Sequence, residues 1–343
     1  MTTALHVSVI LPCRNEAKYI CACLESVLAN DYPKERLEVL VVDGMSEDGT
    51  RAVVQRYART HPFIRLVDNP RRVTPAALNL GLRSARGSAI IVMGAHAAYP
   101  ATYISALVSW LQSTGADAVG GCCLARPGLA TATGRAIAAA VSHPFGVGNS
   151  YFRTGVLEPR WVDTVPFGCY RRDVFDRVGV FDEELVRNQD DEFNHRILRR
   201  GGRLLLVPAI ACEYYTRESL GKLWRAFFQD GYFKPLAVRK IGAVMTGRQL
   251  VPAVFVSSIV LAALFAPWLG VARWLLPIEL GVYLAGDLIV AAAIAWRAGS
   301  RVGLAASAVF PVLHFAYGVG YLLGVFDFLI RGKRCAPAVS LSR

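Results

Sequence analysis

The sequence predicts an α/β domain built on a mainly parallel sheet, followed by helices long enough to cross a membrane. Three observations support this fold class. Short β-branched runs alternate with helical patterns over roughly the first 115 residues, as in successive βαβ units. Long apolar runs fill the chain from Leu250 onward. Hydrophobic residues make up 54% of the 343 residues and the mean hydropathy is +0.36, which is high for a purely soluble protein.

The elements of the first domain follow from the spacing of apolar residues. Pro12 ends the first β-branched run, and Pro75 suits the first turn of a helix. Residues 120–165 are glycine-rich, and we interpret 142–153 within them as a mobile loop. We expect strands at 7–11, 37–42, 64–67, 89–93 and 204–207, and helices at 14–28, 50–59, 74–85, 101–113, 171–178 and 191–200.

Three polar loops follow the first, second and fourth expected strands. Their sequences are RNE (14–16), DGMSEDGT (43–50) and GAHAAYP (94–100). Because ligands of parallel α/β sheets bind beyond the carboxyl ends of the strands, we expect these loops to lie together on one rim.

The second half of the chain points to a membrane. Residues 219–240 mix basic and aromatic side chains, which suits either an interfacial helix or a helix that covers the sheet. Apolar runs then occupy about 250–270, 274–296 and 302–330, each long enough to cross a bilayer. Pro311 and several glycines interrupt the third run, which suggests a broken or re-entrant segment. We expect a catalytic domain at 1–216, an amphipathic segment at 217–248, a transmembrane region at 249–330 and a basic tail at 331–343.

Orientation is harder to assign. The apolar stretch 5–12 is too short for a signal peptide, so the large domain is expected in the cytoplasm, under the inner (plasma) membrane. Three full crossings would then place Arg331, Lys333 and Arg334 outside, against the positive-inside tendency.

The net charge and the cysteine content limit which classes of partner and metal we expect the protein to bind. The net charge is +12, which favours an anionic membrane surface or phosphate-bearing substrates. No helix-turn-helix, RNP-like or zinc-finger pattern supports nucleic acid. The eight cysteines include two close pairs that do not match zinc-site spacing, so we expect free, buried thiols and no zinc.

Three consecutive carboxylates stand at the start of one expected helix, in the stretch NQDDEFNHR from Asn188 to Arg196. Asn188 is suited to cap the first turn, and the helix dipole favours ionised carboxylates there. Asp190 and Asp191 are therefore candidates for a general base, with an ordinary acidic first turn as the alternative. Glu192 is expected to pair with Arg196 four residues on.

Taken together, these motifs resemble those of the family 2 glycosyltransferases, and most of all the membrane-anchored enzymes of the succinoglycan-biosynthesis type. The resemblance covers essentially the whole chain and implies a GT-A fold, a nucleotide-sugar donor and transfer with inversion. It is carried by VSVILPCRNE (7–16), VVDGMSEDGT (41–50), AALNLGLRSARG (76–87), GAHAAYP (94–100), HPFGVGNSYFR (143–153), VDTVPFGCYRRDVF (162–175), FDEELVRNQDDEFNHRI (181–197) and FAYGVGYLLG (315–324).

The resemblance implies a nucleotide site on the rim. Asp43 matches the carboxylate that contacts the base, whereas Asp48 more simply shapes its own turn. Asn79 and Arg83 share a helix face near the nucleotide, and Arg83 is a candidate for a phosphate contact. The first loop contributes Pro12, Arg14, Asn15 and Glu16.

The loop after the fourth strand departs from the family pattern. Relatives carry Asp-x-Asp or Asp-x-His there to hold Mn²⁺ or Mg²⁺, whereas this chain has Gly94, Ala95 and His96. His96 is the tentative metal ligand, or else contacts the diphosphate itself. Asp163 or Asp190 is a further candidate to complete a metal shell.

Asp190 matches the catalytic base of the family, with Gln189 in place of the usual Glu. The charge that develops on the leaving diphosphate must be met by metal, by His96 or by basic side chains. The basic candidates are Arg153, Arg171 and Arg172.

The expected acceptor is a polyprenyl-phosphate or polyprenyl-diphosphate saccharide in cell-surface polysaccharide assembly. A Gln-x-x-Arg-Trp motif of processive relatives is missing, which favours single addition. The candidates for acceptor or lipid contacts are Trp224, Gln229, Tyr232, Asp287 and His314. Two other functions remain open: a polyprenyl-phosphate sugar synthase, and a catalytically silent nucleotide-binding scaffold subunit.

Overall fold

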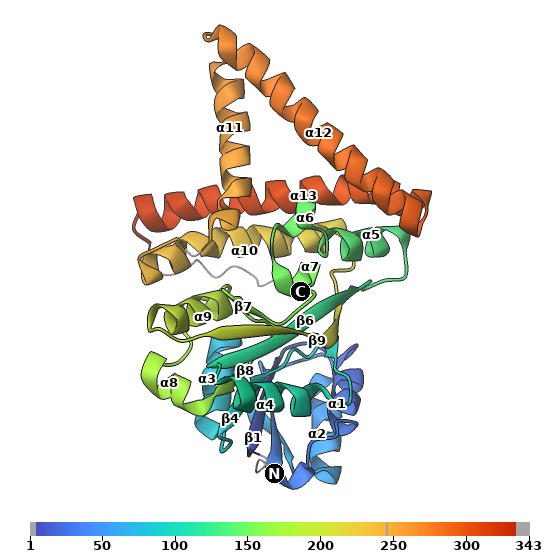
Figure 1. Cartoon of the computed structure of the whole chain (residues 1–343), viewed down its shortest axis with the longest axis vertical. Helices are drawn as coiled ribbons and strands as arrows, with labels where there is room; N and C mark the ends of the chain where they lie inside the picture. The colour runs from blue at the N-terminus through green and yellow to red at the C-terminus, as the bar shows by residue number, and fades with distance from the viewer. Residues whose placement is uncertain (1–4, 245, 334–343) are drawn as a thin grey trace. The chain divides into compact units, whose positions relative to one another are not determined.

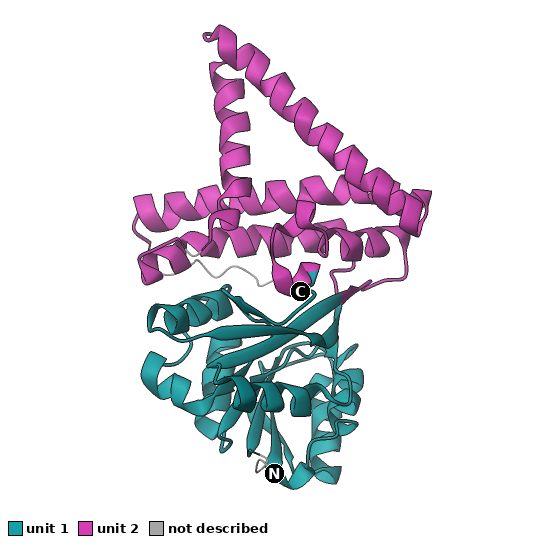
Figure 2. Cartoon of the chain, viewed as in Figure 1, with its two compact units in different colours: residues 1–124, 155–214 teal, residues 125–154, 215–343 magenta. Residues whose placement is uncertain are grey.

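The computed structural model describes residues 5–244 and 246–333, which form two compact units. The first unit contains residues 1–124 and 155–214, and the second contains 125–154 and 215–343 (Figure 2). The boundary near residue 215 lies close to the expected end of the first domain. The assignment of 125–154 to the second unit was not expected, because that segment interrupts the first unit in sequence.

The first unit is built on one mixed sheet (Figure 1). Its first four strands are parallel, as predicted: β1 pairs with β2 and β4, and β2 pairs with β3. Beyond β4, the pairs β4–β8, β6–β8, β5–β9 and β7–β9 are antiparallel, and the strand order is β3-β2-β1-β4-β8-β6-β9-β5, with β7 beside β9. The strands are β1 (Val7–Cys13), β2 (Leu37–Asp43), β3 (Ile64–Asp68), β4 (Ala89–Val92), β5 (Ala97–Ala98), β6 (Ala118–Arg126), β7 (Arg160–Val162), β8 (Cys169–Arg171) and β9 (Leu204–Tyr215).

Helices flank this sheet at nearly the expected positions. Most ends agree with the sequence prediction to within about two residues. The first helix begins later than expected, after Asn15 adopts a positive φ of 54°. The helices of the first unit are α1 (Ile20–Leu28), the 3₁₀ turn η1 (Lys34–Arg36), α2 (Thr50–Thr60), α3 (Thr74–Ser84), α4 (Tyr103–Thr114), α8 (Arg172–Val178) and α9 (Gln189–Arg199).

The second unit is helical, and it corrects the expected loop at 142–153. Thr131 Oγ1 accepts a hydrogen bond from the Gly134 amide at 3.0 Å and caps α5, while Pro144 occupies the first turn of α6. The elements are α5 (Ala132–Ala140), α6 (Pro144–Val147), α7 (Tyr151–Thr154), α10 (Leu220–Ile241), the 3₁₀ turn η2 (Gly247–Gln249), α11 (Val251–Phe265), α12 (Gly270–Ala298), α13 (Ser300–Gly324) and the π-helix η3 (Val325–Ile330).

Three segments of the second unit are long and apolar enough to cross a membrane: Gly247–Phe265, Gly270–Ala298 and Ser300–Ile330. The third is not broken, because α13 continues through Pro311 and ends in the π-helix. The seven described cysteines are free; six are buried as expected, but Cys21 is exposed. Arg334 and Cys335, like most of the expected basic tail, lie outside the described residues.

Candidate functional site

The loops after β1, β2 and β4 lie at one edge of the sheet. The parallel register pairs Cys13 with Asp43 at the ends of β1 and β2. Gly94 follows β4 two residues after Val92, which pairs with Ile10 of β1. The three polar loops therefore form the expected rim.

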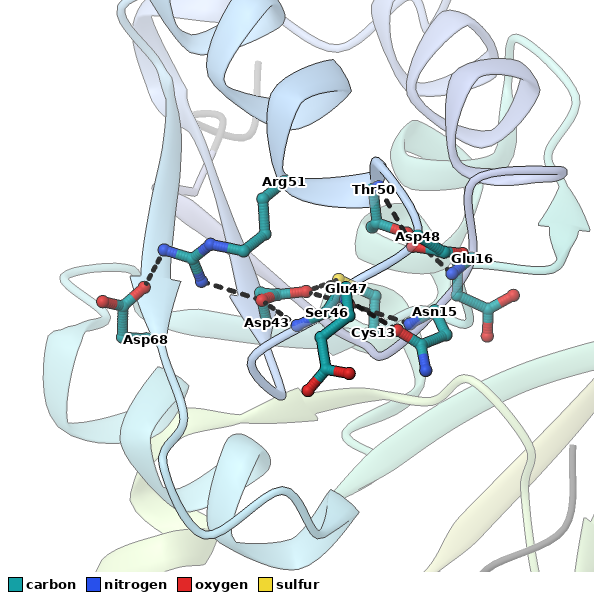
Figure 3. A network of polar contacts seen from close by, with 10 residues as sticks. All are labelled: Cys13, Asn15, Glu16, Asp43, Ser46, Glu47, Asp48, Thr50, Arg51 and Asp68. Atoms are coloured by element: carbon teal, nitrogen blue, oxygen red, sulfur yellow. Dashed lines mark hydrogen bonds and ion pairs between the residues drawn. The ribbon is translucent and has the colours of Figure 1, made fainter.

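Asp43 is the centre of a polar network on this rim (Figure 3). Its carboxylate accepts from the Ser46 amide at 2.9 Å, from Ser46 Oγ at 2.5 Å and from Arg51 Nη1 at 2.8 Å. The side chain has no exposed surface. Arg51 also binds Asp68 at 2.8 Å, and the two hydrogen-bonded carboxylates raise the pKa of its guanidinium. The sequence analysis missed Arg51, although its position in the first turn after the loop was a usable signal.

The first loop is fastened to the second by bonds between side chains and backbone (Figure 3). The Asn15 amide donates to Ser46 Oγ at 2.8 Å, and Asn15 Oδ1 accepts from the Glu47 amide at 3.0 Å. The backbone amide of Glu16, a buried residue, donates to Thr50 Oγ1 at 2.7 Å. These bonds hold the two loops as one rigid surface.

Asp48 shapes its own turn, as predicted. It accepts from Thr50 Oγ1 at 2.6 Å and from the Ala17 amide at 3.0 Å. Partial burial raises the pKa of its carboxyl, but the hydrogen bonds outweigh this and leave that pKa below its ordinary value.

Arg14 is exposed on the rim, and Pro12 is half-buried at the end of β1. A side chain at Gly44 would lie 3.2 Å from Arg14 Cβ and Cδ, so glycine leaves room for the arginine to cross the second loop. Arg14 is therefore an exposed cation on the rim, with a charge suited to an anionic ligand.

Asn79 and Arg83 differ in environment although they share a helix. Asn79 is buried, donates to the Phe181 carbonyl at 2.9 Å and accepts from the Phe181 amide at 3.0 Å. It also donates to Glu183 at 2.8 Å. Arg83 is exposed. Asn79 thus fastens the segment before α9 to α3.

A carboxylate at position 94, which the family resemblance implies, would require the neighbouring ring to shift. A Cβ at this position would lie 2.7 Å from Cε1 of Phe167, a residue with a positive φ of 44°. His96 is half-buried, with its ring 5.0 Å from that of Tyr214 in an edge-to-face contact. Among the described residues no cluster of three or more His, Cys, Asp or Glu side chains suits a metal. The loop does not fit the two-side-chain metal cradle implied by the resemblance.

The acidic first turn of α9 is held by aromatic packing. Phe193 is fully buried and lies 5.1 Å from Phe175, 4.6 Å from Phe181 and 5.6 Å from Tyr170 between ring centroids. These contacts fix the helix, and the expected Glu192–Arg196 pair forms at 2.5 Å.

Within that turn, Asp190 is exposed and Asp191 half-buried. Asn188 occupies the cap position with a positive φ of 60°, but its side chain makes no capping hydrogen bond, so the predicted cap is wrong in that respect. The two aspartates stand on a rigid helix end, at its positive pole.

Two polar neighbours of this turn were not predicted. Burial raises the pKa of the Tyr170 phenol, and the charges of Asp190 and Asp191 raise it further. Burial and then Arg199 lower the pKa of His195, whereas the nearby carboxylates, which include Asp191, oppose that shift. The only sequence signal for His195 was its position four residues after Asp191 on a helix.

The three arginines that were candidates to stabilise the leaving diphosphate do not lie together on the rim. Arg172 donates to the carbonyls of Ala85 and Gly87 at 2.9 and 3.0 Å, before the start of β4 and away from the rim. Arg171 binds Asp173 at 3.0 Å beside it. Arg153 lies in α7 of the second unit. Arg171 and Arg172 were candidates for the leaving group with a structural role as the favoured alternative, and their contacts at the opposite end of β4 agree with the structural role.

The acceptor candidates all lie in the second unit. Trp224 is 39% exposed, whereas Gln229 is buried. Tyr232 donates to Asp327 at 2.6 Å. Asp287 is buried, and its Oδ1 has no hydrogen-bond partner among the residues that the structure describes. The ring nitrogens of His314 contact the Tyr283 hydroxyl and the Phe145 carbonyl, each at 2.8 Å.

Comparison with known proteins gives a consistent result. The model of the family described as glycosyl transferase family 2 matches residues 8–179. The chain is 30% identical over 328 residues to the succinoglycan biosynthesis protein ExoA of Rhizobium meliloti, covering 95% of this chain and 97% of that protein.

A second relative acts on a lipid-linked sugar by its name, dolichyl N-acetyl-alpha-D-glucosaminyl phosphate 3-beta-D-2,3-diacetamido-2,3-dideoxy-beta-D-glucuronosyltransferase of Methanococcus voltae. It is 31% identical over 248 residues, which are 68% of this chain and 74% of that protein. Among solved structures, the mannosyltransferase PcManGT of Pyrobaculum calidifontis, in complex with GDP-Man and Mn²⁺, has a TM-score of 0.59 at 24% identity, over 94% of this chain and 88% of that one. That likeness shows the GT-A fold.

Proposed function

The chain belongs to glycosyl transferase family 2, and on that premise we propose that it moves a sugar from a UDP-sugar to a polyprenyl-linked saccharide, with inversion at the anomeric carbon. The domain is a glycosyltransferase of the GT-A fold. The observation that carries the proposal is the pairing of a braced polar rim with a rigid helix end that bears Asp190 and Asp191.

On the donor side, the rim binds the nucleotide. Arg14 supplies an exposed cation, and the Asn15 and Glu16 loop is already fixed against the second loop, so little entropy is lost on binding. Asp43 is buried among Ser46 and Arg51, and in this arrangement it positions those residues. His96 contacts the diphosphate. We derive no step through a metal.

On the acceptor side, Asp190 is the general base. It removes the proton from an acceptor hydroxyl while the oxygen attacks the anomeric carbon on the face opposite the phosphate. The bond from that carbon to the phosphate oxygen breaks, and its electron pair leaves with the nucleoside diphosphate. Asp191 is the neighbour that competes for this role.

A lipid-linked acceptor explains why the domain is joined to apolar helices. The names of the two relatives, one in succinoglycan biosynthesis and one acting on a dolichyl-phosphate sugar, support this class of acceptor. We propose that the enzyme works at the cytoplasmic face of the plasma membrane, in cell-surface polysaccharide assembly, with Trp224, Gln229, Tyr232, Asp287 and His314 as candidate acceptor contacts.

The base is tested by exchanging each carboxylate for its isosteric amide. We expect Asp190→Asn to lower kcat by about 10²- to 10⁴-fold, the usual contribution of a general base, with UDP affinity unchanged. Asp191→Asn is the matched control and should cost far less. If membranes that carry Asp190→Asn keep full activity, Asp190 is not the base.

Nucleotide choice and metal dependence are tested by titrating UDP, GDP and CDP into the purified protein, with Mn²⁺ or with a chelator. Binding of UDP in the chelator is the expected result for a rim that relies on Arg14 and His96. Binding only with Mn²⁺ would show that His96 and other side chains form a metal site without the usual carboxylate. A lack of any nucleotide binding would favour the scaffold alternative.

Product analysis distinguishes the proposed enzyme from the other enzymatic alternative. A polyprenyl-phosphate sugar synthase would glycosylate bare polyprenyl phosphate, whereas the proposed enzyme requires a saccharide already attached to the lipid.

A further inference from the structure

Helices α10 and α13 come into backbone contact over about two turns of α13, from Tyr317 to Gly324. A Cβ at Gly231 would lie 2.2 Å from the Tyr317 carbonyl oxygen, and one at Gly320 would lie 2.2 Å from that of Phe228. Gly324 meets α10 in the same way. Since any side chain at these positions would force the helices apart, the axis of α13 must follow that of α10 (Figure 1).

Helix α10 cannot cross hydrocarbon, because charged groups are too costly there. Its 22 residues include six charged side chains: Lys222, Arg225, Asp230, Lys234, Arg239 and Lys240. A helix of this kind lies at the membrane surface. Because α13 runs alongside it, α13 is held at the same depth.

The end of α13 is also tied to α10 by polar contacts. Tyr232 donates to Asp327 at 2.6 Å, and Lys333 binds the same carboxylate at 2.8 Å. Arg239 donates to the Phe328 carbonyl at 2.5 Å. Lys333 therefore lies on the same side of the membrane as Arg239.

Helices α11 and α12 have a different surface. Within the most apolar stretch of each segment, protein buries only 17% of Gly247–Phe265 and 11% of Gly270–Ala298, compared with 44% of Ser300–Ile330. At about 1.5 Å per residue these two segments reach roughly 28 and 43 Å. The first is close to the thickness of a core of about 30 Å and falls within the usual range of about 17–25 residues for a span, and the second exceeds it and can cross at a tilt. The four-residue connection 266–269 makes them antiparallel.

The two ends of this hairpin carry membrane-interface residues. At the turn, Trp268 and Trp274 are each 73% exposed, and Arg273 donates to the carbonyls of Ala266 and Pro267 at 2.8 and 3.0 Å. Tryptophan is enriched at both bilayer interfaces. At the other end of α12, Trp296 is 92% exposed.

Basic residues are divided unequally between these ends. The turn has one, Arg273, whereas the opposite end gathers Arg239, Lys240, Arg248, Arg297, Arg301, Arg331 and Lys333. The positive-inside tendency then places the latter set in the cytoplasm.

We propose that the chain crosses the bilayer twice, through α11 and α12, and that α13 lies with α10 at the cytoplasmic surface as a membrane-facing platform. The inference rests on the membrane attachment that belongs to the proposed function. It removes the conflict created by three crossings, since Arg331 and Lys333 remain on the cytoplasmic side.

Cysteine labelling in sealed vesicles of both orientations tests this topology. All variants carry Cys21→Ser, which removes the exposed thiol of the described residues. Native Cys335, two residues after Lys333, probes the tail. With Cys335→Ser, Ala243→Cys probes the end of α10 and Leu269→Cys probes the turn. The variant with both serines is the background control.

A membrane-impermeant maleimide should label positions 243 and 335 in inverted vesicles, and position 269 in right-side-out vesicles. Labelling of position 335 together with 269 would establish three crossings and overturn the proposal. Labelling of all three positions on one side would show that the hairpin does not cross, which would overturn it too. UDP binding measured on the same vesicles tests the enzyme function separately.

Discussion

Replacement of Asn79 by alanine should destabilise the protein without a direct loss of nucleotide contacts. The side chain closes two hydrogen bonds with the Phe181 backbone, at 2.9 and 3.0 Å, in a buried position. Alanine leaves a buried N–H and a buried C=O unpaired, at about 1–3 kcal/mol each, so the total is roughly 2–6 kcal/mol. At about 2–4 °C per kcal/mol for a unit of this size, that corresponds to a fall in Tm of roughly 4–24 °C.

Thermal unfolding of the full chain in detergent, followed by intrinsic fluorescence, measures this change. Arg83→Ala, one turn along the same helix and exposed, is the matched control and should leave Tm nearly unchanged. We expect UDP to bind folded Asn79→Ala within about threefold of the native affinity, because the substitution removes no direct nucleotide contact. A threefold change in affinity corresponds to about 0.65 kcal/mol. An unchanged Tm with a tenfold loss of UDP affinity would refute the reasoning and make Asn79 a nucleotide ligand.

Three further predictions follow from the site. Gly94→Asp should destabilise the protein and fail to create a metal site, because its Cβ meets the Phe167 ring. Adding Phe167→Ala relieves that contact but removes the ring that packs on Tyr99 and Tyr214, so the pair should cost less than the sum of the two separate effects. Thermal unfolding with and without Mn²⁺ checks both. Arg51→Met should weaken UDP binding, since it leaves the buried carboxylate of Asp43 without its cation, and Arg56→Met on the exposed face of the same helix is the control, both read by calorimetry. His195 has a lowered pKa in the folded state, so its contribution to stability is complete above the unfolded pKa of about 6.5 and is lost as the pH falls below it; His195→Gln should therefore flatten part of the fall in Tm between about pH 7 and 5.

Local patterns predicted the first four strands because each is a short β-branched run bounded by a helix signal. Strand β6 was not predicted, since its two adjacent glycines lower the apparent strand propensity, and β8 was not predicted because it has only three residues. In the structure a Cβ at Gly121 would lie 2.2 Å from the Ile210 carbonyl, and one at Gly120 would lie 2.6 Å from Val165 Cβ. Glycine is required there by a close neighbour distant in sequence, which single-sequence reasoning does not reveal.

The same limit applies to the site. The order of the loops on the rim could be predicted from strand alternation, because parallel register brings their ends together. The sequence could not predict that Phe167 fills the space beside Gly94, because the two residues are 73 positions apart and no local pattern links them. Asn79 was expected near the nucleotide for its position on a helix face, yet its partner proved to be the Phe181 backbone.

The polar rim and the Asp190 turn are held by different forces, so we expect them to respond to different substitutions. Polar bonds through Ser46 and Thr50 brace the rim, so their loss should act on donor affinity. The Asp190 turn is instead positioned by Phe193 and its ring contacts, which depend on volume rather than charge. A Phe193→Leu exchange should therefore lower kcat while UDP affinity is retained, whereas Ser46→Ala should weaken UDP binding first. Because each half keeps its own scaffold, donor binding and base positioning are free to vary independently across substitutions.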